Sequence, residues 1–379
     1  MNAGTEHMDS QLFTPWTDPV SGVQSFILSK RAAPVQQSFY YTNPSFTSDG
    51  RFLWFSCSFP PGGDGHYGRQ LAVVDFEAQE VRLFPETQFM GSSPCVDLDN
   101  GDAYWTTGLE IWKRGPMREN KPILINTFPD EFAKKRRPGR IASHLTMSAD
   151  RKTFAIDAVI GRESIVGDIP LDGGPFRLWQ IFDRHYDHAQ FSPTDPDMIL
   201  IAQDPWTDIV TGEYNNSVDR LWVIRRGEKA RPILPDSPLP SGQRGHEWWD
   251  ADGKHVWFLD YTEGPDQGTK KVNIHTGKVE TFWPHGHSHS HCDRSGKYFI
   301  GDIVSWPKDA WQVAFFNSVT KREVALVTCL PPLPIRSKYH VHPHPQFCMN
   351  DKYVCYTTNV LGTVDVALVP VDYLIGLTN

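Results

Sequence analysis

Histidines recur at one place in a pattern that repeats along the chain. Each copy has two variable positions after its first residue, then in most copies an aromatic or apolar residue, a turn of the Ser-Asp-Gly kind and a strand. Histidine has only 15 copies in 379 residues, yet it begins five copies of the pattern, at His144, His188, His246, His289 and His344. Equivalent positions of a circular repeat lie at equivalent radius, so we expect these imidazoles to form a partial ring around a central axis.

Three histidines near the C-terminus alternate along the chain. His340, His342 and His344 share one face if their segment is an extended strand, because side chains alternate there with a period of two. Together with His289 from the neighbouring repeat, His342 and His344 can chelate a divalent cation and leave coordination positions open, as catalysis requires. Imidazole ligands favour manganese, zinc, iron or nickel over calcium or magnesium. We therefore predict a metal site on these residues.

Histidines also have purely structural roles. A lone histidine more often hydrogen-bonds within a core or a turn than binds a metal, so a structural role stays open for His144 and His188. The His-rich tract 285–291 is equally compatible with an exposed loop that binds metal weakly.

The repeat itself predicts the fold. Seven copies begin 43 to 58 residues apart, the size of a four-stranded propeller blade with variable loops, and their first residues are 43, 94, 144, 188, 246, 289 and 344. The 30 prolines and 29 glycines are spread between short aromatic and β-branched runs, which is typical of many short antiparallel strands. We expect an all-β, seven-bladed β-propeller forming a single domain over residues 1–379. The exceptions are a poorly ordered segment over residues 1–15 and a short helix near residues 130–136.

Charge and cysteine content restrict the partners and the compartment. The net charge of −8 disfavours a general affinity for nucleic acid or anionic membranes, and no apolar run reaches the length that spans a bilayer. Six scattered cysteines without a CxxC pair are typical of reduced thiols. We expect a cytoplasmic protein, with a removed secretion signal as the alternative.

Over essentially its whole length the sequence distantly resembles the oligogalacturonate lyase family, cytoplasmic pectin-degrading enzymes with a seven-bladed propeller and a manganese-type site. The N-terminal stretches 17–22, 39–41 and 46–50 resemble the family's opening blade. Further on, Asp219-Arg-Leu-Trp222 resembles the stretch with the active-site arginine, and Gly245-His-Glu-Trp-Trp249 resembles the segment that holds the proposed base. Finally, Ser288-His289 and His342-Pro-His-Pro345 match the metal-binding histidine segments.

The resemblance implies a role for each matched residue. A divalent metal, manganese first and zinc, iron or nickel as alternatives, is expected on His289, His342 and His344. Arg220 is expected to pair with a substrate carboxylate, and His246 to remove the proton from C5 of a 4-linked uronide in an acidic oligosaccharide. Substrate contacts are expected at His144, His188 and Tyr41.

Two positions depart from the family. The fourth metal ligand of the family, a glutamine, is replaced by Tyr339, and we expect the adjacent His340 to substitute for it or the site to be more open. A family histidine of the first blade corresponds to Gln37. Both departures lie near the substrate, so a lyase for another uronide, such as a rhamnose–glucuronate glycan, remains an alternative.

Several readings compete with these roles. Without the resemblance, Arg220 could form a surface salt bridge. The basic run 134–137 with Arg140 is either a solvated face or a rim that attracts an acidic oligosaccharide. A hydrolase using calcium would need carboxylate and amide ligands on the axis instead of histidines. A non-catalytic propeller module would have no tightly held metal.

Overall fold

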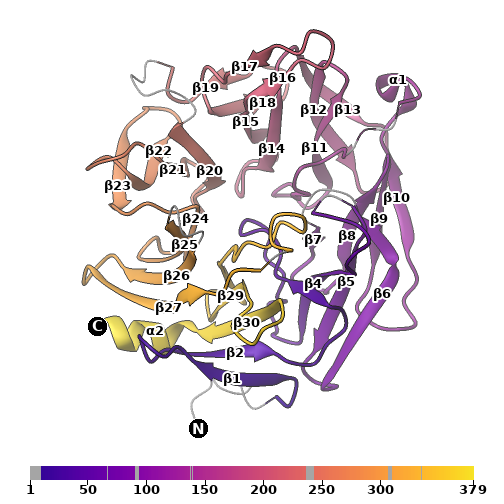
Figure 1. Ribbon diagram of the computed structural model, residues 1–379. Helices are drawn as coiled ribbons and strands as arrows, with labels where there is room; N and C mark the ends of the chain where they lie inside the picture. The colour runs from indigo at the N-terminus through magenta and orange to yellow at the C-terminus, as the bar shows by residue number, and fades with distance from the viewer. Residues whose placement is uncertain are drawn as a thin grey trace.

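The propeller is built from seven antiparallel sheets arranged around an axis, which confirms the predicted all-β, seven-bladed fold (Figure 1). The computed structural model of the chain describes residues 10–65, 67–89, 94–136, 138, 140–235, 243–305, 310–333 and 335–379. Each sheet has one copy of the sequence repeat in or next to the first of its strands in the repeat. Among the described residues the only helices are α1 (Asp130–Ala133), where a short helix was expected, and α2 (Val371–Thr378).

The first three sheets in chain order after the N-terminal strands show how a blade is made. Neighbouring strands are joined by hairpins, so chain order and sheet order agree. Their strands are β3 (Val35–Gln37), β4 (Phe52–Ser58), β5 (Arg69–Asp75) and β6 (Glu80–Phe89), then β7 (Cys95–Val96), β8 (Ala103–Thr107), β9 (Glu110–Arg114) and β10 (Ile123–Thr127), and then β11 (Thr153–Ile160), β12 (Glu163–Pro170) and β13 (Arg177–Phe182).

The next three sheets follow the same plan. A small two-stranded ribbon, β16 (Trp206–Thr207) and β17 (Tyr214–Asn215), projects from the first of them. The strands are β14 (Tyr186–Phe191), β15 (Met198–Gln203), β18 (Leu221–Arg225) and β19 (Arg231–Pro232), then β20 (Arg244–Trp249), β21 (His255–Asp260), β22 (Gly268–Asn273) and β23 (Val279–Trp283), and then β24 (His289–Cys292), β25 (Tyr298–Ser305), β26 (Ala310–Asn317) and β27 (Arg322–Leu330).

The seventh sheet closes the ring with both ends of the chain. N-terminal β1 (Phe13–Thr17) and β2 (Gln24–Leu28) pair with C-terminal β30 (Asp365–Pro370), which continues into β29 (Tyr353–Thr358) and β28 (Gln346–Cys348). We expected residues 1–15 to be poorly ordered; residues 1–9 lie outside the described residues, but β1 begins at Phe13 and is hydrogen-bonded to β2. The burial of Phe13 explains this difference, because the side chain anchors the strand.

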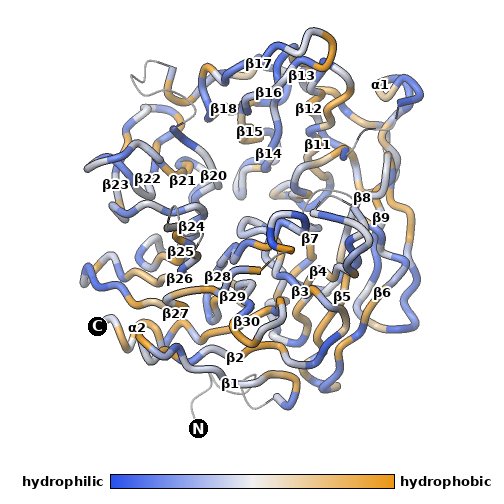
Figure 2. Tube along the Cα trace, in the orientation of Figure 1, coloured by the Kyte–Doolittle hydropathy of each residue, from blue (hydrophilic) through white to orange (hydrophobic). Residues whose placement is uncertain are grey.

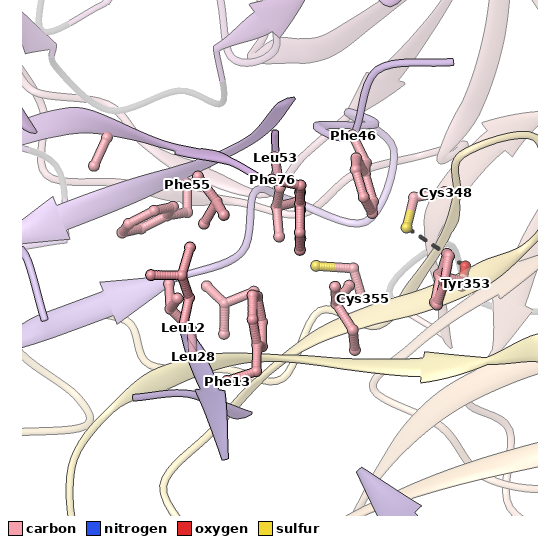
Figure 3. Packing of buried hydrophobic residues seen from close by; sticks show 14 of the residues in the cluster. Leu12, Phe13, Leu28, Phe46, Leu53, Phe55, Phe76, Cys348, Tyr353 and Cys355 are labelled. Carbon is pink, nitrogen blue, oxygen red and sulfur yellow. Dashed lines mark hydrogen bonds between the residues drawn. The ribbon is translucent and has the colours of Figure 1, made fainter. Parts of the chain in front are cut away.

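Apolar side chains fill the space between adjacent blades. Figure 2 shows the hydrophobic stretches along the strands and more hydrophilic colours at many of the connecting loops. Between the closing sheet and its neighbour, Phe13, Phe46, Phe55 and Phe76 pack with Leu53 and with residues of β29 (Figure 3). This burial holds the N- and C-terminal strands against the first blade and so keeps the ring closed.

The axis of the ring is crossed by a segment of the first blade. The innermost strand leaves its ladder after Gln37, opposite Ser56, and rejoins it at Phe46, opposite Leu53. We call residues 38–45 the axial segment. Hydrogen bonds tie it to several blades: the Gln346 side-chain amide donates to the Phe39 and Tyr40 carbonyls, and the Asn43 side-chain amide donates to the Pro94 and Leu145 carbonyls. The segment gives the histidines of the other blades a common wall.

Neither described helix has the length and apolar character needed to cross a bilayer. All six cysteines are free thiols, as the sequence predicted.

Candidate metal and substrate site

Three histidines from two adjacent blades come together beside the axis. One ring nitrogen from each of His289, His342 and His344 lies within 4.8 Å of the others. The three rings border a cavity of about 250 Å³ that is also lined by His144, His188, His246 and His340. The volume is near the lower end of the range of small-ligand sites, roughly 300–1,000 Å³. The expected partial ring of histidines therefore exists, and the three that could bind a metal together lie on one side of the cavity.

Asp302 orients the His289 ring. Its carboxylate accepts from His289 Nδ1 at 3.0 and 3.1 Å and from the His289 backbone N–H at 2.7 Å. A carboxylate only accepts, so Nδ1 carries the proton and Nε2 is left as the metal-binding nitrogen. The same carboxylate receives the backbone N–H of His344 at 3.3 Å. One buried acid thus positions two of the three expected ligands.

The chain places its histidines in the cavity by interrupting the strand ladders. His188 and His246 each sit at a register shift of the innermost strand, with φ of 52° and 50°. His344 has φ of 42° just before β28. This left-handed conformation is unfavourable for a side chain with a Cβ, and such strain is concentrated at functional sites. His289 instead lies in a regular ladder opposite Asp302.

The expected extended strand over His340, His342 and His344 is wrong. The segment turns, with the His340 N–H bonded to the Ser337 carbonyl at 3.3 Å and the His342 N–H to the His340 carbonyl at 3.1 Å. Pro343 and Pro345 lack an N–H, so the segment cannot complete a ladder. The His340 ring still lies 4.1 Å from that of His342, but it is exposed and lies outside the compact group of three.

Tyr339 is directed away from the three histidines. Its hydroxyl donates to the Gly62 carbonyl at 3.0 Å, and the residue is 1% exposed. Its backbone carbonyl accepts from the Gln37 side chain at 3.2 Å. The two positions that depart from the family pattern are therefore bonded to each other, and neither replaces a ring nitrogen in the group.

His246 has the surroundings of a neutral base. Its ring lies 4.2 Å from that of His289, and its Nδ1 is hydrogen-bonded to the Tyr261 hydroxyl. Tyr261 can donate its own proton to the Ser288 carbonyl, 3.5 Å away, and then accepts from His246 Nδ1. That arrangement leaves Nε2 as an acceptor. Burial, and then the neighbouring His289 and Arg220, lower the pKa of His246 well below 6.5 and keep it neutral near pH 7.

His188 has the opposite tautomer. Its Nδ1 lies 2.9 Å from Nη2 of Arg220, which can only donate, so Nδ1 accepts and Nε2 carries the proton. Burial lowers the pKa of His188 despite the nearby Asp187. His188 can therefore donate a hydrogen bond into the cavity, whereas His246 can accept a proton there.

Arg220 is a buried structural cation and does not line the cavity. Its guanidinium pairs with Glu247 at 3.0 and 3.2 Å and also with Asp204. These carboxylates raise its pKa against the effect of burial. Both edges of its fork already have partners, so a substrate carboxylate would have to displace one of them, and the expected substrate contact of Arg220 stays a prediction. The buried ion pairs exclude the alternative of a surface salt bridge.

The basic run divides into two environments. Lys134 forms an exposed pair with Glu163 at 3.2 Å, whereas Arg140 lines the cavity and pairs with Asp187 at 2.7 Å. Arg137 lies outside the described residues. The run is therefore not one continuous charged face.

His144 and two tyrosines of the axial segment lie beside the three histidines, with the Tyr40 ring 4.9 Å from that of His344. His144 is 6% exposed, and neither of its ring nitrogens has a partner among the described residues. It stacks on Tyr40 at 4.3 Å and on His188 at 5.0 Å. Tyr40 lines the cavity, whereas Tyr41 is 1% exposed and packs on Trp248 and His291. The Tyr41 ring contacts those of Tyr40 at 4.5 Å and His289 at 5.6 Å from behind the cavity lining, and its expected substrate contact stays a prediction.

A second group of possible ligands is already neutralised. His185, Asp187 and Asp204 offer atoms within 4.8 Å of one another. Arg140 pairs with Asp187 and Arg220 with Asp204, so two cations occupy the position that a metal would take.

Sequence reasoning missed four residues of the site: Tyr40, Arg69, Glu247 and Asp302. Asp302 had a detectable signal, because it is the one acid in the apolar run Tyr298–Ser305 and a buried charge needs a partner. Glu247 follows the predicted base directly. Arg69 had no signal of spacing or type.

No protein-family model and no curated protein sequence matches the chain. Among solved structures, an oligogalacturonate lyase in complex with manganese superimposes with a TM-score of 0.76 at 16% identity, covering 94% of this chain and 96% of that one. An oligogalacturonate lyase from Vibrio parahaemolyticus gives 0.76 at 17% identity with the same coverages. A hydrazine synthase from Kuenenia stuttgartiensis gives 0.53 at 13% identity, covering 89% and 97%. At these identities the likeness shows the fold, so the argument for function rests on the site.

Proposed function

We propose that the protein is a metal-dependent lyase that cleaves a 4-linked uronide by β-elimination and leaves a 4,5-unsaturated uronate. One observation carries the proposal: the ring of His246 lies 4.2 Å from that of His289, in a group of three histidines that can chelate a divalent cation. Burial lowers the pKa of His246 well below 6.5, which favours its neutral form. Structural similarity to oligogalacturonate lyases supports a lyase-like propeller.

The residues fit a divalent cation. His344 Nε2 is buried without a hydrogen-bond partner among the described residues, and the tautomer of His289 directs Nε2 away from Asp302. His289, His342 and His344 would hold the ion, with His340 as an additional ligand from outside the compact group. Manganese is the first candidate, and zinc, iron and nickel suit the same donors. When bound, the ion would act as a Lewis acid on the uronate carboxylate.

The chain's own side chains would move the protons. His246 accepts the C5 proton at Nε2, the C5–H electron pair forms the C4=C5 double bond, and the C4–O bond breaks with its pair on oxygen. The leaving oxygen takes a proton from water. His188 and His144 hold the sugar by hydrogen bonds, and Arg220 acts as a positioning residue that fixes His188 and Glu247.

Two alternatives are weighed against this function. A lyase for another uronide, such as a rhamnose–glucuronate glycan, would use the same groups and differ only in the sugars next to the reacting one. A non-catalytic interaction module needs neither a neutral base nor a group of buried ligands, and both argue against it. We also propose a cytoplasmic location and a single propeller domain, both from the sequence.

A panel of uronides tests the function. Purified protein, reconstituted with manganese, is incubated with galacturonate oligomers and with a rhamnose–glucuronate glycan, and the ultraviolet absorbance of an unsaturated product is followed. We expect product from a galacturonate oligomer, and none after chelation of the metal. Substrate cleavage without an unsaturated product would indicate a hydrolase, and a protein that neither retains metal nor reacts would favour the interaction module.

A further inference from the structure

Three arginines surround the site, and they differ in how their charge is compensated. Arg220 has two carboxylate partners and Arg140 has one. Arg69, at the start of β5, lines the same cavity, yet no ion pair joins it to a carboxylate among the described residues. Arg69 is therefore the arginine of the cavity with no carboxylate within ion-pair distance among the described residues, although Asp64 acts on it electrostatically.

The contacts of Arg69 leave most of its guanidinium unused. Nη2 donates to the Tyr339 carbonyl at 3.1 Å, and Nε is buried without a hydrogen-bond partner among the described residues. Burial lowers the pKa of Arg69 to about 10, an effect that Asp64 opposes electrostatically, so the group stays charged at neutral pH. Arg69 as a whole is half-buried, but a buried donor such as its Nε is costly to leave without an acceptor. An anionic ligand in the cavity would supply that acceptor.

Arg69 is tied to the segment that carries the expected metal ligands. Its partner Tyr339 directly precedes His340 and the pair His342 and His344. The Gly65 N–H, from the loop before β5, donates to the Lys338 carbonyl at 2.8 Å. The two segments therefore form one wall of the cavity, and an anion bound by Arg69 would be a close neighbour of an anion bound at the three histidines.

We propose that Arg69 binds a second carboxylate of the substrate, on the sugar next to the one whose carboxylate lies at the histidine group. The planar fork of arginine matches a carboxylate with two parallel hydrogen bonds, given by Nη2 together with one of the other two nitrogens. Nε has no partner among the described residues, and Nη2 has a second proton besides the one that it gives to the Tyr339 carbonyl. This proposal rests on the proposed function and refines it. It predicts a substrate with uronates on consecutive sugars, which separates a homouronide from a glycan in which uronates alternate with neutral sugars.

The test compares two trisaccharides of 4-linked galacturonate. One has three free carboxylates, and the other has a free carboxylate only on the central, reacting sugar because its neighbours are methyl esters. For the unmodified protein we expect kcat/KM to be about 10- to 100-fold higher on the free trisaccharide, the range of a charge-assisted hydrogen-bonded pair. In Arg69→Gln this preference should fall to near one, with the loss mainly in KM. Arg69→Lys should keep part of it.

Controls separate Arg69 from net charge and from folding. Arg118→Gln removes the same charge at an exposed pair with Glu80 outside the cavity, and it should retain the full preference. Thermal unfolding establishes whether Arg69→Gln folds, and Arg69→Lys serves in its place if it does not. An Arg69 variant that keeps the full preference, or an Arg118→Gln variant that loses it equally, would overturn the proposal.

A binding measurement distinguishes this failure from failure of the proposed function. Calorimetric titration of metal-free protein with the fully free trisaccharide needs no turnover. Weaker binding by Arg69→Gln than by Arg118→Gln, about 10-fold or more, supports the carboxylate contact even if no unsaturated product forms. Equal binding by the two variants contradicts the contact even if the protein is an active lyase.

Discussion

Replacing Asp302 with asparagine should weaken metal binding without removing any metal ligand. The carboxylate holds the His289 ring through Nδ1 and the backbone of His344 through its N–H. Asparagine has the same shape but only one acceptor oxygen. If that oxygen stays on His289, the new amide NH₂ faces the His344 N–H, a contact between two donors. If it turns to His344, it can still accept from His289 Nδ1, but the amide NH₂ then faces the His289 backbone N–H, again a contact between two donors.

The magnitude follows from the role of such supporting groups. Loss of the acid that orients a ligating histidine typically lowers metal affinity 10- to 100-fold. We therefore expect Asp302→Asn to weaken manganese binding by that factor, or about 1.4 to 2.7 kcal/mol. The loss is less than expected for His289→Ala or His344→Ala, since all three ring nitrogens remain.

The assay is competition for manganese with a fluorescent chelator at pH 7.5, where solvent-exposed imidazoles are largely neutral. Asp293→Asn is the matched control, because Asp293 is a buried acid of the same blade that bonds only to its own turn. It should bind manganese as the unmodified protein does. Unchanged affinity in Asp302→Asn, or an equal loss in Asp293→Asn, would refute the positioning role and with it the orientation inferred for His289.

Four further predictions concern the base, the pH dependence of activity, the pH dependence of stability, and the buried arginine. His246→Ala should lower kcat by about 10²- to 10⁴-fold while manganese content stays unchanged; equal activity would exclude His246 as the base. Because the pKa of His246 is depressed, the base stays neutral on acidification, and the acid limb of kcat/KM should lie below pH 6.5. Burial likewise lowers the pKa of His144 and His344, so the unfolded chain binds more protons than the folded protein below pH 6.5. The free energy of unfolding of metal-free protein should therefore decrease as the pH is lowered, by up to about 1.4 kcal/mol per pH unit for each histidine. A stability that is constant between pH 7 and 5 would contradict this. Arg220→Met should cost about 3–5 kcal/mol of unfolding free energy in chemical denaturation, because it leaves Glu247 and Asp204 without their cation; a loss below 1 kcal/mol would show that the pair is not buried as described.

The sequence allowed the fold and the centre of the site to be predicted for the same physical reason. A propeller repeats one strand pattern at one radius, so the histidines that begin the repeats were expected near the axis, and His289 and His344 lie there together with the nearby His342. The backbone between them was not predictable from alternation, because Pro343 and Pro345 turn the segment and His344 adopts a left-handed conformation. The rule that side chains alternate between two faces does not hold where a strand leaves its hydrogen-bonded ladder.

The arginines show a second limit of prediction from the sequence. Spacing and resemblance pointed to Arg220, but whether a charged side chain faces a cavity depends on the acids that surround it in space. Glu247 and Asp204 come from other parts of the chain and bind Arg220, while Arg69 is left facing the cavity. Likewise, Tyr40 and Tyr41 are adjacent residues of the same type, and only the path of the axial segment decides that Tyr40 lines the cavity.

The central claim is that His289, His342 and His344 bind one cation together. The most direct measurement is anomalous X-ray scattering from crystals grown with manganese, recorded on both sides of the manganese absorption edge. The account predicts one strong anomalous peak within bonding distance of a nitrogen of each of the three rings. A strong peak elsewhere in the molecule, or none at manganese concentrations that support activity, would contradict it.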